Sequence, residues 1–260
     1  MRLDKFLAEA SVGTRKVIRG EVKEGKVTVN DQVIWNPAAE IEEKTDVIRY
    51  LGKEVTHAGK VYYMFHKPAG CVTARKDADN TTVLDYFDVD IRGGLFPVGR
   101  LDKDTEGLLL LTNDGEFSHR LMHPDKHVNK TYFFWAYGSL DSEDIKRLKT
   151  GINMGEGEAL AIASKFEVKE QGSYQELKER MDVVNSKDIN INPYKQSVVS
   201  GYITISEGRK HQVKRMLKAV GCYVAYLKRI SIGGLMLDSS LELGQYRELT
   251  ETEKNILKND

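Results

Sequence analysis

Nine residues near the middle of the chain combine charged side chains that acid–base or nucleophilic chemistry could use. Residues 99–107 read Gly-Arg-Leu-Asp-Lys-Asp-Thr-Glu-Gly, between an apolar stretch at 95–98 and four leucines at 108–111. Such apolar runs predict buried strands, so the charged residues form a loop that is held at both ends. A carboxylate in this loop, Asp102 or Asp104, could act as a nucleophile or as a base. An ordinary polar connection would have the same composition, so the loop alone does not decide between these interpretations.

Two segments concentrate positive charge although the whole chain is neutral. The 39 Lys and Arg residues balance the 39 Asp and Glu residues, so the overall basicity of many nucleic-acid-binding proteins is missing. Residues 207–230 contain seven Lys and Arg but one Glu, a charge of +6, and residues 1–27 contain seven basic and four acidic side chains, a charge of +3. Solvated helix faces often have such runs, and any surface that binds phosphates must be local.

Composition excludes several classes of protein. Apolar residues make up 40% of the chain and charged residues 30%, and no apolar run reaches the ~18–20 residues that cross a bilayer. We therefore expect no membrane segment. The two cysteines, Cys71 and Cys222, have no close-spaced partner, so a disulfide framework is not predicted and a cytoplasmic location is expected.

A metal site is not predicted either. His119, His123 and His127 recur at every fourth position, but Pro124 interrupts the helix that would align them. No carboxylate–histidine motif accompanies the three histidines, and we expect no metal ligands among them.

The beginning of the chain predicts a small domain. Apolar residues recur at helical spacing over 2–10, and Thr14 can cap a second helix. Two short apolar runs flank the turn residues Asn30-Asp31, which predicts a β-hairpin. We expect a domain over 1–52 and a polar linker over 53–58.

The rest of the chain, 59–260, predicts a larger mixed domain. Apolar runs of strand length are followed by capped, amphipathic helices, which is typical of an α+β fold with a sizeable sheet. The predicted strands lie at 61–65, 108–111, 131–137 and 202–205, and the predicted helices lie at 115–122 and 213–220.

The motifs occur in an order that resembles a known family. Residues 99–115 closely resemble the catalytic signature of the RsuA family of pseudouridine synthases, and residues 1–50 resemble the S4 RNA-binding domain. The resemblance implies a small S4-like α/β RNA-binding domain followed by a mixed, largely antiparallel-sheet catalytic domain. The other matching segments are Lys-Pro-Ala-Gly at 67–70, Lys-Thr-Tyr at 130–132, the stretch 207–216, Ile-Gly-Gly at 232–234 and Gly-Gln-Tyr-Arg at 244–247.

The resemblance also implies roles for individual residues. Asp102 matches the catalytic aspartate of the family, and Asp104 matches a less constrained position. Tyr132 would stack on an extruded base. Lys214 would pair with Asp102 and keep it ionised, although it also lies in a row with Lys210 and Lys218 that is typical of a solvated helix face. The implied isomerisation needs no metal and no redox agent, so no cofactor is predicted.

The basic segments would then contact RNA. Arg100, which precedes the catalytic aspartate in the family motif, could occupy the space that a flipped nucleotide leaves. The full set of predicted RNA contacts is Arg100, Arg2, Lys5, Arg15, Lys16, Arg19, Lys23, Arg209, Lys210 and Arg229.

Two other functions compete with this one. A non-catalytic S4-type RNA-binding protein would have lost a catalytic side chain, and a glycosidase-like hydrolase would need better separated carboxylates than Asp102 and Asp104. Lys214, His211 and the S4-like domain favour 16S small-subunit ribosomal RNA as the target, with 23S RNA as the alternative. The expected partner is ribosomal RNA or a ribosomal assembly intermediate, bound by a monomer.

Overall fold

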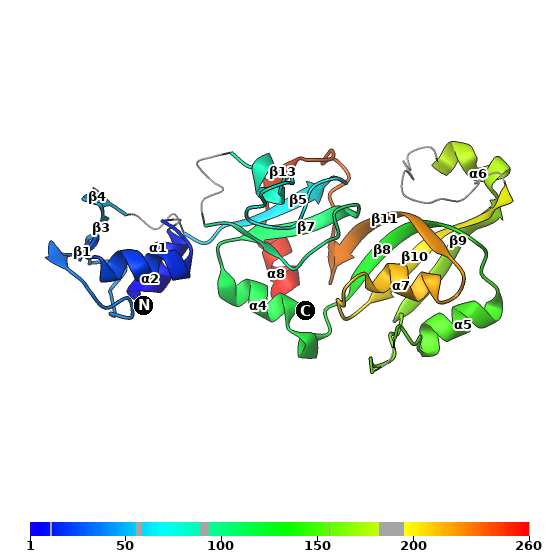
Figure 1. Cartoon of the computed structure of the whole chain (residues 1–260), viewed down its shortest axis with the longest axis horizontal. Helices are drawn as coiled ribbons and strands as arrows, with labels where there is room; N and C mark the ends of the chain where they lie inside the picture. The colour runs from blue at the N-terminus through cyan, green and yellow to red at the C-terminus, as the bar shows by residue number, and fades with distance from the viewer. Residues whose placement is uncertain (11, 56–58, 89–93, 156, 182–194, 260) are drawn as a thin grey trace.

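Two separate sheets, each with its own helices, organise the chain (Figure 1). The computed structural model describes residues 1–10, 12–55, 59–88, 94–155, 157–181 and 195–259. In that part of the chain no helix is long and apolar enough to cross a membrane. The predicted α+β class, with a small α/β domain followed by a mixed and mostly antiparallel sheet, is confirmed.

The first domain packs two helices on a four-stranded sheet of order β2-β1-β3-β4. Apolar residues at helical spacing, such as Leu3 and Leu7 of α1 and Ile18 and Val22 of α2, are buried against the sheet. The Thr14 side chain accepts a hydrogen bond from the backbone N–H of Val17 and caps α2 as predicted. The elements are α1 (Leu3–Glu9), α2 (Arg15–Lys23), β1 (Val27–Val29), β2 (Gln32–Val33), β3 (Ile48–Tyr50) and β4 (Lys53–Glu54).

The predicted hairpin joins β1 and β2. Asn30 and Asp31 have φ angles of 51° and 66°, the left-handed pair that a two-residue hairpin turn requires. The predicted linker at 53–58 starts too early, because β4 pairs with β3 and completes the first sheet. Residues 56–58 lie outside the described part of the chain.

The second domain is built on a nine-stranded sheet whose main order is β13-β5-β7-β11-β8-β10-β9, with β12 beside β11 and β6 beside β7. Of the described pairings, β7 with β11 is parallel and the others are antiparallel. The strands are β5 (Tyr62–Lys67), β6 (Phe96–Val98), β7 (Glu106–Thr112), β8 (Lys130–Tyr137), β9 (Lys165–Ser173), β10 (Ser197–Ile205), β11 (Tyr223–Ile232), β12 (Leu235–Met236) and β13 (Tyr246–Glu248).

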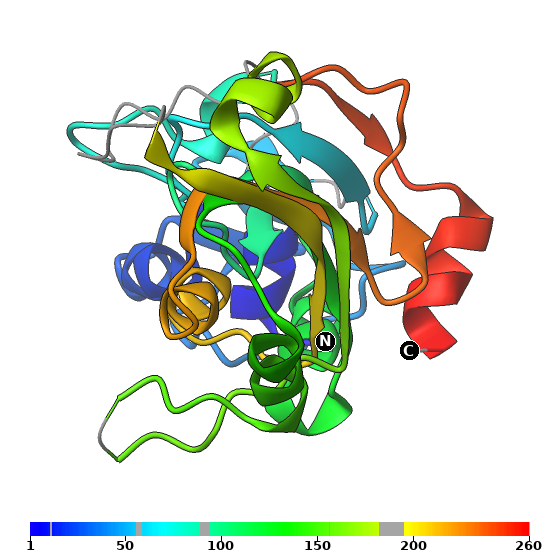
Figure 2. The ribbon, with the colours of Figure 1, turned by 90° about the vertical axis from the view of Figure 1, so that its right-hand side faces the viewer.

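Helices cover both faces of this sheet, and Figure 2 shows α7 and α8 on opposite sides of it. Successive strand side chains alternate between the faces. Leu109 and Leu111 of β7 therefore join the core under α7, and Leu108 and Leu110 join the core under α8. The four leucines thus mark a strand buried on both sides. The helical elements are η1 (Val83–Tyr86), α4 (Gly115–Met122), η2 (Pro124–Lys126), α5 (Ser142–Thr150), α6 (Tyr174–Met181), α7 (Gln212–Lys218) and α8 (Glu251–Asn259).

Candidate active site

The charged loop that follows β6 begins and ends at glycines that the geometry requires. Gly99 and Gly107 have φ angles of 72° and 104°, a region that side chains other than glycine rarely adopt. A Cβ on Gly99 would lie 2.5 Å from the sulfur of Met122, and a Cβ on Gly107 would overlap the backbone carbonyl oxygen of Arg229. The loop that carries Asp102 is therefore closely packed at both ends, against the Met122 side chain at Gly99 and against the backbone of β11 at Gly107.

A buried lysine holds the far side of the loop. Lys67, at the end of β5, is 0% exposed, and its ammonium donates to the carbonyl oxygens of Pro68 at 3.0 Å, Lys103 at 3.3 Å and Thr105 at 2.9 Å. Burial lowers the pKa of Lys67, and the nearby acidic side chains, Asp102 among them, oppose part of this effect. The backbone N–H of Gly70 adds a hydrogen bond of 2.7 Å to the Lys103 carbonyl.

Thr73 holds the residue that precedes Asp102. Its hydroxyl donates to the carbonyl oxygen of Leu101 at 2.7 Å and accepts from the backbone N–H of Leu101 at 3.1 Å. One side chain thereby satisfies both backbone polar groups of Leu101. This restricts the direction in which the side chain of the next residue, Asp102, can point. Sequence reasoning missed Thr73, because a threonine in a polar turn carries no distinctive signal.

Asp102, Tyr132 and Lys214 line one pocket, although they come from a loop, from β8 and from α7. Tyr132 is 8% exposed, and the side chain of Asp102 is 30% exposed, so the carboxylate is reached through the pocket. Apolar side chains form part of the wall, and such a mixture of apolar walls and a few polar groups is typical of a small-molecule site. The apolar members are Leu101, Ile205, Val213 and Leu227, and Arg100 is exposed beside them.

The charges in the pocket are arranged differently from the prediction. The Lys214 ammonium lies 3.9 Å from an oxygen of Asp102, but it donates to both carboxylate oxygens of Asp104 at 2.6 Å. His211 Nε2 lies 3.6 Å from the other oxygen of Asp102. Asp102 therefore has two cationic or titratable neighbours, and Asp104 is the direct partner of the lysine.

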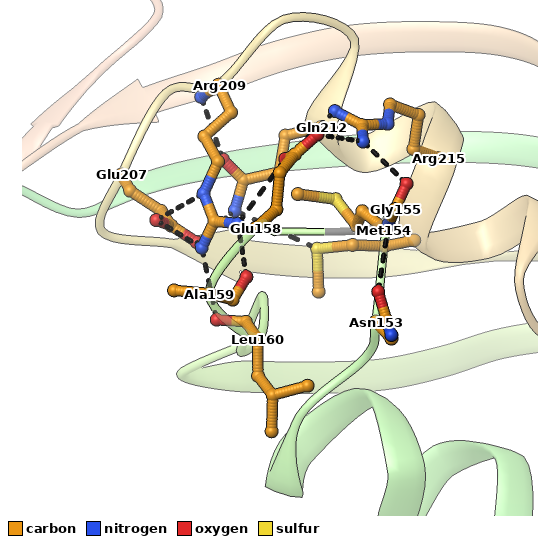
Figure 3. A network of polar contacts seen from close by, with 11 residues as sticks. Asn153, Met154, Gly155, Glu158, Ala159, Leu160, Glu207, Arg209, Gln212 and Arg215 are labelled. Carbon is orange, nitrogen blue, oxygen red and sulfur yellow. Dashed lines mark hydrogen bonds and ion pairs between the residues drawn. The ribbon is translucent and has the colours of Figure 1, made fainter.

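Arg209 also lines the pocket, but its guanidinium is committed to other parts of the protein (Figure 3). It donates to both carboxylate oxygens of Glu207 at 2.8 Å and to the carbonyl oxygen of Leu160 at 3.0 Å. Gln212 donates to Glu207 at 2.7 Å. These contacts hold the turn before α7 against the loop at 157–160, and the RNA contact of Arg209 stays a prediction.

Arg229 corrects the sequence prediction outright. It is 2% exposed and lies on β11, where its Nε donates to the carbonyl oxygen of Leu108 at 2.8 Å. Because the Arg229 side chain is buried where β11 lies beside β7, it cannot reach phosphates on the surface. The prediction was wrong because a charged residue in a strand gives no indication that the strand is central in the sheet.

The predicted contacts of the first domain fall into three groups. Arg2 and Arg19 donate to the buried carboxylate of Asp4 at 3.0 and 2.9 Å, and both remain about half exposed. Burial raises the pKa of Asp4, but these hydrogen bonds outweigh it and the pKa lies below its usual value. Lys5 donates to Glu116 of the second domain at 2.8 Å. Arg15, Lys16 and Lys23 on α2 are exposed, and so is Lys210 in the second domain.

Asp102 thus shares one pocket with the ring of Tyr132 and lies 3.9 Å from the ammonium of Lys214, an arrangement suited to nucleophilic or acid–base catalysis by an enzyme. The profile of the RNA pseudouridylate synthase family matches residues 61–219, and that of the S4 domain matches residues 1–48. The chain belongs to the RNA pseudouridine synthase family, in its RsuA-like group with an N-terminal S4 domain, and it is an intramolecular isomerase. The S4 domain binds RNA.

Individual relatives match along nearly the whole chain. The uncharacterized RNA pseudouridine synthase YtzG of Bacillus subtilis is 40% identical, covering 99% of this chain and 98% of the relative. Ribosomal small subunit pseudouridine synthase A of Escherichia coli is 35% identical, covering 97% and 98%. A crystal structure of a pseudouridylate synthase superposes with a TM-score of 0.63 at 32% identity and covers 99% of both chains. The predicted family resemblance is confirmed.

Proposed function

We propose that this enzyme converts a uridine of 16S ribosomal RNA, free or in an assembly intermediate, to pseudouridine. The support for this target comes from relatives named as ribosomal small subunit enzymes, which are 35–37% identical over 97% of the chain. Residues 1–55 would hold the RNA, and residues 59–260 would carry the chemistry.

The observation that carries the catalytic assignment is the position of Asp102. Its carboxylate lies in the same pocket as the ring of Tyr132 and within 4 Å of two side chains that can carry positive charge, Lys214 and His211. In the reaction the bond from uracil N1 to ribose C1′ breaks and a bond from uracil C5 to C1′ forms, while C5 loses its proton and N1 gains one. A carboxylate can serve this exchange as a nucleophile or as a base.

Other residues would bind and orient the nucleotide. Tyr132 would stack against the extruded base, and the apolar wall of the pocket would hold the freed uracil away from water. Arg100 is exposed at the pocket and has no hydrogen bond or ion pair to any described residue. It is therefore available to fill the space that the extruded nucleotide leaves in the RNA.

The experiment is to incubate the purified protein with 16S and 23S transcripts and to map pseudouridine in both. We expect a modified 16S site, while modification of 23S RNA alone would refute the proposed target.

In the same assay Asp102→Asn should lose more than about 10³-fold in rate, because an amide is a poor nucleophile and a poor base. Asp104→Asn is the matched control and should stay within about tenfold of wild type. A dead Asp104→Asn beside an active Asp102→Asn would reverse the assignment.

A further inference from the structure

A second pocket lies where the two domains meet. Its lining includes Lys5, Glu9 and Arg15 from the first domain and Arg75, Asn113 and Glu116 from the second. The domains contact each other here, since Asn113 donates from its side-chain amide to the carbonyl oxygen of Glu9 at 3.2 Å and Lys5 donates to Glu116 at 2.8 Å. The pocket is therefore bounded by direct contacts between the domains.

Lys5 lies near both acidic side chains of this pocket. Lys5 pairs with Glu116 at 2.8 Å and lies 3.9 Å from Glu9. Two arginines remain. The closest carboxylate contact of Arg15 is a long one, 3.9 Å to Asp4, and its side chain is 51% exposed. Arg75 makes no hydrogen bond or ion pair to any described residue.

Arg75 is the more informative of the two. Its side chain is half-buried, and this burial lowers the pKa of Arg75, with no acidic neighbour among the described residues to oppose the effect. A guanidinium partly removed from water without a counter-ion is unfavourable unless an anion binds to it. Its planar set of donors matches the two free oxygens of a phosphodiester.

The segment that contains Arg75 also leads to the active site. Thr73, two residues earlier, holds Leu101 through its hydroxyl. Val72 and Thr73 line a groove together with Arg100, Asp102 and Lys210. The segment 72–75 thus borders the groove of Asp102 at one end and the pocket between the domains at the other.

We propose that the pocket between the domains binds a backbone phosphate of the RNA strand whose uridine enters the active site, with Arg75 as the main contact and Arg15 as the second. This inference rests on the proposed ribosomal RNA substrate. It adds to the basic surface of the S4 domain a contact point on the catalytic domain, so that RNA held at the pocket keeps the two domains together.

The test compares Arg75→Ala with Lys76→Ala in the full-length protein. Lys76 is the next residue, has the same charge, is exposed, and lines neither the pocket nor the groove. The measurement is the Kd for a 16S fragment that contains the modified site, by fluorescence anisotropy at several salt concentrations. Arg75→Ala should bind roughly tenfold more weakly, and its salt slope should fall by about one unit. Lys76→Ala should stay within about twofold of wild type.

Arg75→Lys should bind with intermediate affinity, because the charge remains and the planar fork is lost. It also keeps the test valid if thermal melting shows that Arg75→Ala folds poorly. Equal affinities and equal salt slopes for Arg75→Ala and Lys76→Ala would overturn the inference. Failure of the proposed target is a separate result, since the wild-type protein would then leave the 16S transcript unmodified.

Discussion

Lys214 is shared by two carboxylates, and its ammonium is closer to the one that we do not assign to catalysis. It lies 2.6 Å from Asp104 and 3.9 Å from Asp102. The side chain of Asp104 is 62% exposed, whereas that of Asp102 is 30% exposed. An ammonium has three donors and no fixed plane, so one lysine can serve both carboxylates, which a bidentate arginine would do less readily.

If Lys214 supports Asp102 during the reaction, Lys214→Met should lower kcat by more than about tenfold and change RNA affinity by less than about threefold. Lys214→Arg should be partly active, because the charge remains. Single-turnover rates and Kd values on the 16S substrate check this. The control is Lys218→Met, on the next turn of α7 and exposed. Equal rates for the two methionine variants would show that Lys214 is only part of a solvated helix face.

At the scale of secondary-structure elements, the end of β5 and the turn after it hold the backbone of the catalytic loop in place. Lys67 and Gly70 hold the carbonyl of Lys103, and Thr73 holds both backbone groups of Leu101. Groups fixed by buried partners before the substrate binds need no reorganisation in the transition state. Thr73 is therefore a positioning residue that acts through Leu101.

Thr73→Val removes the two hydrogen bonds with little change of shape. We expect kcat to fall by roughly tenfold to a hundredfold, because misplacing a reacting group is costly, while KM should change much less. Thr73→Ser should restore most of kcat. Thr81→Val, at an exposed position beside the same turn, is the control. Parallel losses of kcat and melting temperature in both Thr73 variants would indicate a purely structural role.

β8 begins with a lysine that is nearly excluded from water. Lys130 is 7% exposed and donates to the carbonyl oxygen of Val128 at 2.7 Å. Burial, together with the charge of Arg229, lowers the pKa of Lys130 from 10.5 to about 8. The charged form is thus less favourable in the folded protein, and the unfolded chain binds the proton more tightly between these two pH values.

The cost of this charge is fully present below pH 8 and is relieved as the pH rises towards 10.5. The stability of the wild type relative to Lys130→Met should therefore rise between pH 7 and pH 10, by roughly 1–3 kcal/mol. Urea unfolding of both proteins at the two pH values measures the difference. A difference that does not vary with pH would contradict the lowered pKa.

Although the net charge of the whole molecule is zero, exposed lysines are present on both domains. On α2 of the first domain Lys16 and Lys23 are exposed and have no ion pair to any described residue. On the second domain Lys178 of α6 and Lys258 of α8 are also exposed, on the sheet face opposite α7. Phosphate binding falls steeply with salt, and each lysine counts only if it touches RNA.

Replacing Lys16 and Lys23 together with Ala should therefore raise KM for 16S substrate by several-fold and reduce the salt slope of binding by about two units. Turnover at saturating RNA should hardly change, because α2 contributes no residue to the pocket of Asp102. Replacing Lys178 and Lys258 with Ala is the control, with the same loss of charge. If the control weakens binding as much as the α2 variant, RNA affinity follows total charge and not the surface of the first domain.

Much of the fold and of the site could be predicted from local patterns. Helical spacing and a capping threonine located the first-domain helices, and four leucines between glycine and asparagine located the central strand. The motif order identified the family, and Asp102, Tyr132 and Lys214 do line one pocket. These features depend on residue type at short spacing, which the sequence contains directly.

Other features depend on which residues meet across the fold. Arg229 is buried because β11 pairs with both β7 and β8, and Arg209 is occupied because the loop at 157–160 reaches it. Lys214 donates to Asp104 across 110 positions of sequence. Charge can be counted in a sequence, but its effect depends on distance and burial. Partners and exposure are set only when distant strands, loops and helices pack together, so the tertiary structure alone decided which basic residues remain free for RNA.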